Sequence, residues 1–443
     1  MKILLINPPQ CHKVKSNLPS FVDETRGHLP PLGLMYITAI AEKEHDCQIV
    51  DMLAGDILDS YKDTPDLVGI TATTFNVADA LEVAREVKRR WRPKVILGGI
   101  HPSIYPEETQ AQEGVDYAFS GEAETSILEV LKQIDNGTCP PIVQGLPVDM
   151  TKIPYPARHK VDRKRYYSVL GKRRYITSMF TSRGCPFHCI FCHRRTMGRI
   201  FRARGAEQVV GEIKGIKEMG IDEVTIYDET FTVDKQRVKD ICTGLIEDRV
   251  GIALDIRTRV DCVNEEILTL LKRAGCERIH YGVEASSDRI LKILNKGITL
   301  EQVERTFKLT QKLGIEILAY FIIGSPGETV EDIEYTIKYA KKLNPQYCLF
   351  SIMTPFPDTP MYTMGIKEGR YPDYWAEFAK HPSNNYQGSW HHEIPDEELE
   401  RLAQKAYRSF YWRPKQILKE AKKVTSLSIA LKKGRAALGM VRR

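Results

Sequence analysis

The sequence lacks any long apolar run, and this absence excludes a membrane-spanning helix from our expectations. None of its 443 residues lie in an unbroken stretch of the roughly 20 apolar residues that a bilayer span requires. The apolar part of the N-terminus, residues 3–6, is too short for a signal peptide. We therefore expect a cytoplasmic protein.

Cysteine is sparse outside one segment, which argues against a disulfide framework. The chain has 10 cysteines, and three of them, Cys185, Cys189 and Cys192, lie close together. The other seven are scattered over the chain. Reduced cytosol, where thiols serve as metal ligands rather than in disulfides, suits this distribution.

The body of the chain also lacks an excess of basic charge. The net charge is +6, but residues 405–443 carry twelve Lys and Arg against one acid, Glu420, so the remainder is mildly acidic. This excludes a broad nucleic-acid-binding surface on the body. In the basic tail Ile417, Ala421, Val424 and Leu431 recur at helical spacing among lysines. This pattern is typical of a helix at the inner face of a membrane, or of a solvated helix packed on the protein.

The first 140 residues alternate short apolar runs with helical patterns. This predicts a Rossmann-like, doubly wound parallel α/β sheet, because parallel strands need helical crossovers. Strands are expected at 2–7, 47–51, 67–71, 94–98 and 116–119, and helices at 76–91 and 122–134. The phosphate fingerprint G-x-G-x-x-G is missing, which argues against a dinucleotide site. Such sheets bind ligands beyond the carboxyl ends of their strands.

A proline-rich linker, residues 141–172, precedes a second alternating region at 173–360. Its six repeats predict a partial (β/α)6 barrel resembling an open TIM barrel, with active residues at the carboxyl ends of the strands. Strands are expected at 174–181, 222–228, 252–258, 277–283, 316–323 and 347–353. Residues 361–443 form a small helical C-terminal region. Its aromatic-rich part, 371–390, is expected either to cover the barrel mouth or to pack in the core.

The cysteine-rich segment has the spacing C-x3-C-x2-C, formed by Cys185, Cys189 and Cys192. Three thiolates from one loop can hold a metal centre from one side and leave a coordination position open. A structural zinc site that adds His188 or His193 is the alternative. Structural zinc usually takes its ligands from two separated knuckles, which argues against it.

The spacing, the aromatic residue before the last cysteine and Arg183-Gly184 ahead of the first resemble the cluster loop of radical SAM enzymes. The resemblance implies that the three cysteines bind a 4Fe-4S cluster whose fourth iron holds the amino and carboxylate groups of S-adenosylmethionine (SAM). Motifs after later strands are similar to the family's SAM-binding segments. They give the expected SAM contacts Asp228, Glu229, Arg257, Arg259, Glu284, Ser286, Gly324 and Pro355.

Some of these residues could have a purely structural role, and others differ from the residue that the family has. Asp228 and Glu229 could cap the following helix, and one of Arg257 and Arg259 could be in a surface ion pair. Ala285 stands where the family usually has Ser. Asp358 stands where it has Gly, so the conformation of that turn is left open.

The N-terminal segments Asn7-Pro8-Pro9, Pro30-Pro31-Leu32-Gly33-Leu34, Asp51, Gly98-Gly99-Ile100-His101-Pro102 and Gly121-Glu122-Ala123-Glu124 resemble the cobalamin-binding domain of one radical SAM subclass. The expected cobalamin contacts are Asn7, Pro8, Thr71, Thr73, Thr74, Gly98, Gly99, His101, Gly121 and Glu122. The motif Asp-x-His-x-x-Gly is absent, so the histidine that it places below cobalt in other proteins is missing. His101 could approach the cofactor, although a histidine after Gly-Gly more often holds a loop.

These resemblances imply a cobalamin-dependent radical SAM enzyme that methylates an unactivated carbon. A 5′-deoxyadenosyl radical would abstract hydrogen, and cobalamin would supply the methyl group. The first alternative is a radical SAM cyclase of the anaerobic magnesium-porphyrin ester type. The second is a methylthiotransferase, suggested by Cys11 and Cys47, although no third cysteine follows before Cys139. Expected partners are a small, hydrophobic substrate (a lipid, pigment or natural-product intermediate) and a flavodoxin or ferredoxin, with no nucleic acid.

Overall fold

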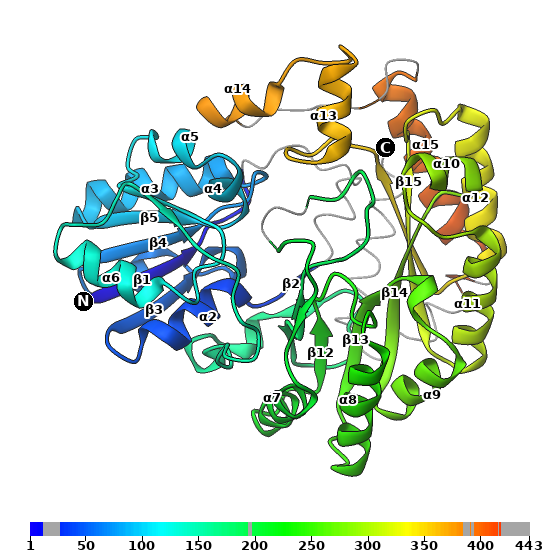
Figure 1. The fold of residues 1–443 in the computed structure, drawn as a ribbon, viewed down its shortest axis with the longest axis horizontal. Helices are drawn as coiled ribbons and strands as arrows, with labels where there is room; N and C mark the ends of the chain where they lie inside the picture. The colour runs from blue at the N-terminus through cyan, green and yellow to red at the C-terminus, as the bar shows by residue number, and fades with distance from the viewer. Residues whose placement is uncertain (12–26, 194–196, 384–389, 391–393, 415, 418–443) are drawn as a thin grey trace.

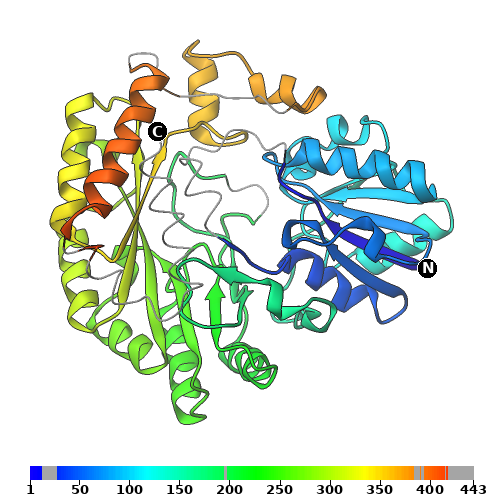
Figure 2. The ribbon, with the colours of Figure 1, turned by 180° about the vertical axis from the view of Figure 1, so that it is seen from behind.

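Two α/β domains lie side by side in the computed structural model (Figure 1 and Figure 2). The structure describes residues 1–11, 27–193, 197–383, 390, 394–414 and 416–417. The N-terminal domain is a doubly wound parallel sheet, and the second is an open barrel of parallel strands. The expected fold class is confirmed.

The N-terminal sheet has the order β3-β1-β4-β5-β6-β7, and all its neighbouring strands run parallel. Its strands are apolar because helices cover both faces; residues 3–6 of β1 are all buried. The strands are β1 (Lys2–Asn7), β3 (Asp46–Asp51), β4 (Leu67–Thr71), β5 (Lys94–Gly98), β6 (Tyr117–Ser120) and β7 (Ile142–Gln144). The helices are α2 (Leu32–Ala41), α3 (Val77–Trp91), α4 (Ile100–Ile104), α5 (Pro106–Gln110) and α6 (Ile127–Asp135).

The barrel sheet has the order β16-β15-β14-β13-β12-β9, again parallel throughout. Its strands are β9 (Ile176–Met179), β12 (Glu223–Ile226), β13 (Ala253–Thr258), β14 (Cys276–Glu284), β15 (Glu316–Ile323) and β16 (Tyr347–Ile352). The outer helices are α7 (Ala206–Glu218), α8 (Lys235–Glu247), α9 (Glu265–Arg273), α10 (Asp288–Ile293), α11 (Leu300–Lys312) and α12 (Val330–Leu343). Strands β9 and β16 form the two edges, so the barrel is open as expected.

Helix α15 (Asp396–Tyr411) covers the edge strand β16. The Tyr411 hydroxyl accepts a hydrogen bond from the Cys348 N–H at 3.0 Å and donates to the Cys348 carbonyl at 2.9 Å. One helical turn earlier, the Tyr407 hydroxyl accepts from the Phe350 N–H at 3.1 Å. These tyrosines satisfy backbone groups that an exposed edge would offer to another chain.

Helices α13 (Pro360–Lys367) and α14 (Tyr374–Lys380) link the barrel to the N-terminal domain, above both in Figure 1. Trp375 is 1% exposed and packs with Tyr374 and Phe378 in the apolar core of the N-terminal domain. Trp390 is also buried, in the barrel core. Of the two readings of the aromatic segment, core packing therefore holds for these residues.

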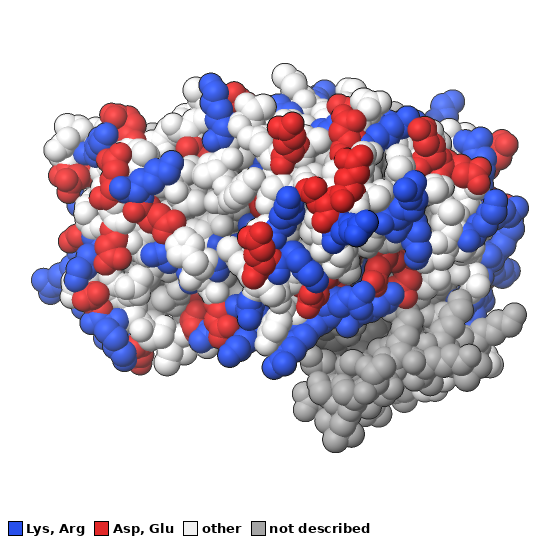
Figure 3. Space-filling model, turned by 90° about the horizontal axis from the view of Figure 1, so that it is seen from below, with Lys and Arg blue, Asp and Glu red and all other residues white. Residues whose placement is uncertain are grey.

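Most of the basic tail, including Ala421, Val424 and Leu431, lies outside the described residues. In the part of the chain that the structure describes, no helix has the length and apolar character of a membrane span. Figure 3 shows Lys and Arg interspersed with Asp and Glu over the described surface of one face.

Candidate functional site

The carboxyl ends of the two parallel sheets face each other, and ion pairs join them. Arg183, just before the cysteine loop, lies 2.5 Å from Glu124 and 3.3 Å from Glu122, which follow β6. Arg202, in the short strand β11 (Arg202–Ala203), binds Glu122 through both its nitrogens, at 2.5 and 2.9 Å. The side chains of Arg183 and Glu122 are each 4% exposed. The ligand faces of both domains are thus held against one another.

The cysteine loop brings its three thiols into one neighbourhood. Cys189 is buried, and its sulfur accepts a hydrogen bond from Arg259 Nη1 at 3.7 Å. Cys185 contacts the Thr230 hydroxyl at 3.8 Å. Cys192 remains solvent-accessible although protein atoms crowd round it, and this crowding, with the nearby Cys189 and Cys185, raises the pKa of its thiol to about 12. Three adjacent thiols are a donor set that fits an iron–sulfur cluster.

The zinc alternative would use His188 or His193 as its fourth ligand. His188 is exposed, and His193 Nδ1 lies 3.6 Å from Asp358 Oδ2. Among the described residues, no group of three or more His, Cys, Asp or Glu side chains, the cysteines included, is already drawn together at metal-binding distances. Cys11 is exposed, and Cys47 is buried within the N-terminal sheet.

Asp228, an expected SAM contact, instead anchors the start of the cysteine loop. It is completely buried and accepts hydrogen bonds from the Thr181 N–H at 2.7 Å, the Thr181 hydroxyl at 2.5 Å and the Ser182 hydroxyl at 2.5 Å. Arg237 donates to the Thr181 carbonyl at 2.8 Å. The side chain of Asp228 is therefore fully used in positioning the loop. Its neighbour Glu229 is exposed and remains available to a ligand.

Arg259 and Glu284 likewise have protein partners close to the loop. Arg259 is held by Asp261 at 2.9 Å and by the Lys296 carbonyl at 2.6 Å, and Phe187 stacks under its guanidinium at 3.8 Å. Glu284 is buried and lies 2.6 Å from Lys296 Nζ. Glu284 has φ +68°, and the pairing of β14 with β15 shifts register beside it. A strained residue at a strand end is typical of a functional site.

The other expected SAM contacts follow β14, β15 and β16. The Ser286 hydroxyl is buried and bonded to that of Thr336 at 2.9 Å. Gly324 has φ +77°, a conformation that glycine adopts without strain. The Pro355 carbonyl accepts from the Tyr374 hydroxyl at 3.1 Å and from Trp375 Nε1 at 2.8 Å, which fixes the loop to the domain link.

The structure gives the conformation of the turn at Asp358, where the family has Gly. Its φ is +58°, in the left-handed region where glycine is favoured and where Asp is among the few other residues tolerated. The chain therefore keeps the turn that a glycine would make, with a carboxylate added beside His193.

The expected cobalamin contacts divide into an accessible set and a buried set. The partly exposed residues lie at the carboxyl ends of β1, β4, β5 and β6, facing the barrel: Asn7, Thr71, Thr73, Gly98, Gly99 and Gly121. Pro8, Thr74, His101 and Glu122 are buried. A row of small and polar groups at this edge fits a large planar cofactor, as sheets of this type bind ligands there.

Several of these residues hold one another. Asn7 Nδ2 donates to Asp51 Oδ1 at 2.7 Å, and the Tyr166 hydroxyl donates to Asp51 Oδ2 at 3.0 Å. Burial raises the pKa of Asp51. The Thr73 hydroxyl and N–H both donate to Asn76 Oδ1, at 2.8 Å each. These hydrogen bonds tie the strand ends to the segments beside them.

His101 is a loop residue in this structure. Its ring is completely buried against Tyr105 and Phe378, Nδ1 contacts the Thr74 hydroxyl at 3.3 Å, and Nε2 has no hydrogen-bond partner. Burial lowers its pKa to about 3, so the ring is neutral. Because it faces aromatic side chains rather than the open edge, its geometry does not favour cobalt ligation.

The glycines at this edge serve contacts within the protein. A Cβ on Gly99, whose φ is +114°, would lie 2.7 Å from the Ala72 carbonyl oxygen. A Cβ on Gly121 would lie 2.8 Å from the Gly145 carbonyl oxygen. Close approach of two loops, rather than of backbone to a ligand, explains both glycines. Glu122 is similarly engaged, by Arg183 and Arg202.

Sequence reasoning did not identify Arg183, Arg202 and Glu124 as joining the domains. The sequence indicates Arg183 only as part of the cysteine-loop motif. Arg202 is 80 residues from Glu122, so no local pattern links them. The arginines that flank the cysteine loop are the sequence feature that could have indicated acidic partners in the other domain.

The barrel interior carries a polar layer below the loop. His280 Nε2 lies 2.7 Å from Asp255 Oδ1, and His280 Nδ1 is 2.7 Å from the Tyr320 hydroxyl. Arg278 binds Asp255 at 2.8 Å and approaches Glu316 at 3.4 Å. Burial lowers the pKa of His280 despite Asp255. These residues alternate along β13, β14 and β15, so they point into the barrel.

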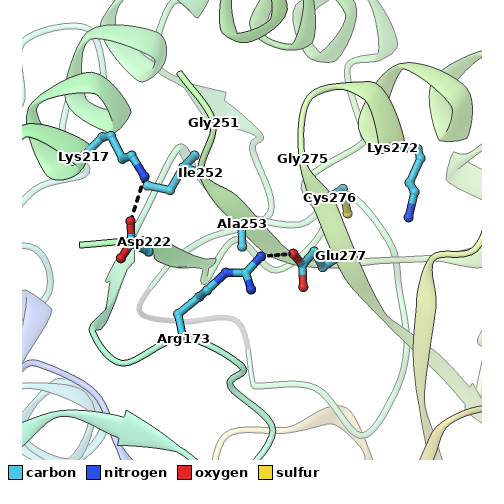
Figure 4. Close-up of a pocket in the computed structure, with 10 residues that line it drawn as sticks. All are labelled: Arg173, Lys217, Asp222, Gly251, Ile252, Ala253, Lys272, Gly275, Cys276 and Glu277. Atoms are coloured by element: carbon cyan, nitrogen blue, oxygen red, sulfur yellow. Dashed lines mark hydrogen bonds and ion pairs between the residues drawn. The ribbon is translucent and has the colours of Figure 1, made fainter. Parts of the chain in front are cut away.

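A pocket of about 350 Å³ lies at the opposite, amino-terminal end of the barrel strands (Figure 4). Its charged side chains are engaged: Lys217 with Asp222 at 2.7 Å, and Arg173 with Glu277. The amino-terminal face of such barrels contributes stability rather than chemistry. We therefore place the site at the facing carboxyl ends.

Comparison with known proteins gives the family of the chain. Residues 179–340 match the family model of the radical SAM superfamily, and residues 20–131 match that of the B12 binding domain. An uncharacterized methyltransferase of Pyrococcus horikoshii is 34% identical, over 95% of this chain and 94% of its own. The anaerobic magnesium-protoporphyrin IX monomethyl ester cyclase of Rubrivivax gelatinosus is 29% identical, over 82% of this chain and 69% of its own.

A solved structure has the same fold over almost the whole chain. It is the cobalamin-dependent S-adenosylmethionine radical enzyme OxsB, with aqua-cobalamin and S-adenosylmethionine bound. The TM-score is 0.71 at 17% identity, over 99% of this chain and 72% of the other.

Proposed function

We propose a function from one premise: the chain belongs to the radical SAM superfamily, in the subclass that carries a B12-binding domain. It is an enzyme that uses a 4Fe-4S cluster, SAM and cobalamin, and methyl transfer to an unactivated carbon is its activity. When bound, SAM on the cluster supplies the 5′-deoxyadenosyl radical, and cobalamin supplies the methyl group.

The observation that carries this proposal is the salt bridge between the two ligand faces. Arg183 immediately precedes the cysteine loop, and its partners Glu122 and Glu124 follow the strand end where a cobalamin would lie. The contact holds the cysteine loop opposite the cobalamin face. Methyl transfer between two cofactors and one substrate needs this fixed geometry.

The residues of the chain have distinct tasks in this proposal. Cys185, Cys189 and Cys192 hold the cluster, and Arg259 places a positive charge against Cys189. Asp228 positions the loop rather than contacting SAM. SAM contacts come from residues that remain accessible or that shape the strand ends, namely Glu229, Gly324 and the backbone around Glu284 and Pro355. The accessible set at the N-terminal sheet edge receives cobalamin.

A radical SAM cyclase remains the second candidate, because a relative 29% identical carries that activity in its name. It would use the same three cofactors without transferring a methyl group. The substrate in either case is a small organic molecule with a hydrophobic part, and the electron comes from a flavodoxin or ferredoxin. We propose that the enzyme acts in the cytoplasm.

The test is to follow the SAM methyl group. Cells that produce the enzyme grow with trideuteromethyl methionine, and their small molecules are compared with those of cells producing the variant with Cys185, Cys189 and Cys192 all replaced by Ala. Methyl transfer predicts a compound that carries the intact label only with the active enzyme, together with S-adenosylhomocysteine from purified enzyme and that compound's precursor. A new product without label would support the cyclase. Unchanged biological activity of the triple variant would indicate a cobalamin-binding sensor instead.

A further inference from the structure

One cation inside the barrel has no carboxylate partner. Arg257 projects inward from β13, and its Nη1 is buried without a hydrogen-bond partner. No carboxylate among the described residues lies within ion-pair distance of it. The neighbouring inward-facing cations are paired: Arg259 with Asp261 at 2.9 Å and Arg278 with Asp255 at 2.8 Å.

Two tyrosines lie beside this guanidinium, and the nearest acid that acts on it, Asp255, lies beyond ion-pair distance. Its Cζ lies 3.7 Å from the ring centroid of Tyr227, and the Tyr227 and Tyr320 hydroxyls are near enough to raise the pKa of Arg257 against the lowering effect of burial. Tyr227 is 38% exposed, so the ring that lies against Arg257 reaches solvent. The site therefore combines a buried cation with a solvent-accessible phenol.

Asp255 and the two tyrosine hydroxyls compensate this buried charge only in part, and an anion bound at Nη1 would complete the compensation. Arginine presents a planar fork that matches carboxylate and phosphate oxygens. We propose that Arg257, with Tyr227 and Tyr320 beside it, binds an anionic oxygen group of the substrate, a carboxylate or a phosphate.

The depth of Arg257 assigns this group to the substrate rather than to SAM. Arg259 contacts Cys189 at the level of the cysteine loop. Arg257 lies within β13, two residues before Arg259, so its backbone is about 7 Å nearer the start of the strand. Its register partner on β14 is His280, within the polar layer. This inference rests on the proposed function, since it extends the same site to the substrate's chemistry.

The test uses reconstituted holoenzyme and small anions as probes. Thermal unfolding is recorded with increasing sodium propionate or inorganic phosphate at constant ionic strength, with and without saturating SAM. We expect the midpoint to rise by about 1–3 °C when the anion reaches ten times its dissociation constant. Arg257→Met abolishes this rise, measured from the variant's own midpoint without added anion. Arg289→Met, which removes an exposed arginine paired with Asp332, keeps it.

Each other outcome overturns the proposal. No rise in wild type, or an equal rise in Arg257→Met, shows that Arg257 binds no such anion. A rise that disappears with saturating SAM, or a tenfold loss of SAM affinity in Arg257→Met, assigns the site to the SAM carboxylate. Absorption spectra of the same samples report the cluster and cobalamin, so failure of the proposed function is recognised separately.

Discussion

At the scale of single residues, the acids and bases around the loop divide between holding the protein and facing a ligand. Asp228 and Glu229 are adjacent, yet one is saturated by Thr181 and Ser182 while the other is exposed. Both residues lie in the loop after β12, which ends at Ile226, and this loop buries one side chain while it exposes the other. Both are expected SAM contacts, and of the two only Glu229 is exposed in this structure.

Removing the Asp228 carboxylate should loosen the cysteine loop. Asp228→Ala leaves three donors without an acceptor, so we expect a loss of about 3 kcal/mol or more in the free energy of unfolding, and reduced iron content. Asp228→Asn keeps one carbonyl oxygen and should lose less. Urea denaturation and iron analysis provide the measurement. Wild-type stability and iron content in the alanine variant would contradict the positioning role.

Glu328 should make stability depend on pH. It is 2% exposed, and burial raises its pKa to about 7, from 4.5. The folded state therefore holds this proton between about pH 4.5 and 7 while the unfolded state releases it, so its contribution to stability falls as pH rises through that window. Glu328→Gln should be the more stable form at pH 8, by up to about 3 kcal/mol.

Urea midpoints of wild type and Glu328→Gln between pH 5 and 8 measure this effect. The difference between the two proteins should grow with pH. Two parallel curves over that range would show that Glu328 ionises as freely in the folded protein as in the unfolded chain.

At the scale of elements, buried strands could be predicted from short apolar runs, but short helices could not be predicted. The strands expected at 67–71, 94–98 and 316–323 correspond to β4, β5 and β15 without adjustment. A buried parallel strand is recognised by a nearly continuous apolar run, which five residues can show. Helices α4, α5 and α10 have five or six residues each, less than two turns, so their periodicity is undetectable.

The tyrosines of α15 offer a test of how the barrel edge is protected. Tyr407→Phe leaves backbone groups of Phe350 without their partner, and we expect a loss of about 1–3 kcal/mol in the free energy of unfolding. Tyr335→Phe on α12, where the side chain is 55% exposed, is the matched control and should change little. Equal effects of both variants would mean that the Tyr407 hydroxyl gives no support to β16.

At the scale of the whole molecule, the contacts between domains decide the site. The sequence predicts that both domains bind ligands at the carboxyl ends of their strands. It does not predict the ion pairs that join the domains, because Glu122 and Arg202 are distant in sequence. The same holds for the aromatic link, where Phe378 contacts His101 from the far end of the chain. Only the assembled fold reveals that Glu122 serves the interface.

Breaking this interface should make the two domains unfold independently of each other. Glu122→Gln leaves Arg183 and Arg202 with less compensating charge, at a cost of about 3–5 kcal/mol by general estimate. We expect the unfolding transition to broaden or split into two, and cobalamin retention to fall. Glu129→Gln, on the outer helix α6, is the control. A single sharp transition at the wild-type midpoint would show that the pairs do not couple the domains.

The most direct measurement of the central claim is the cofactor content of anaerobically reconstituted protein. The absorption spectrum should show corrinoid and iron–sulfur bands together, with about four irons and about one cobalamin per chain. The variant with Cys185, Cys189 and Cys192 replaced by Ala should lose the iron and keep the corrinoid. Absence of corrinoid after supplementation, or iron retained by the triple variant, would contradict the account of two cofactors at facing sites.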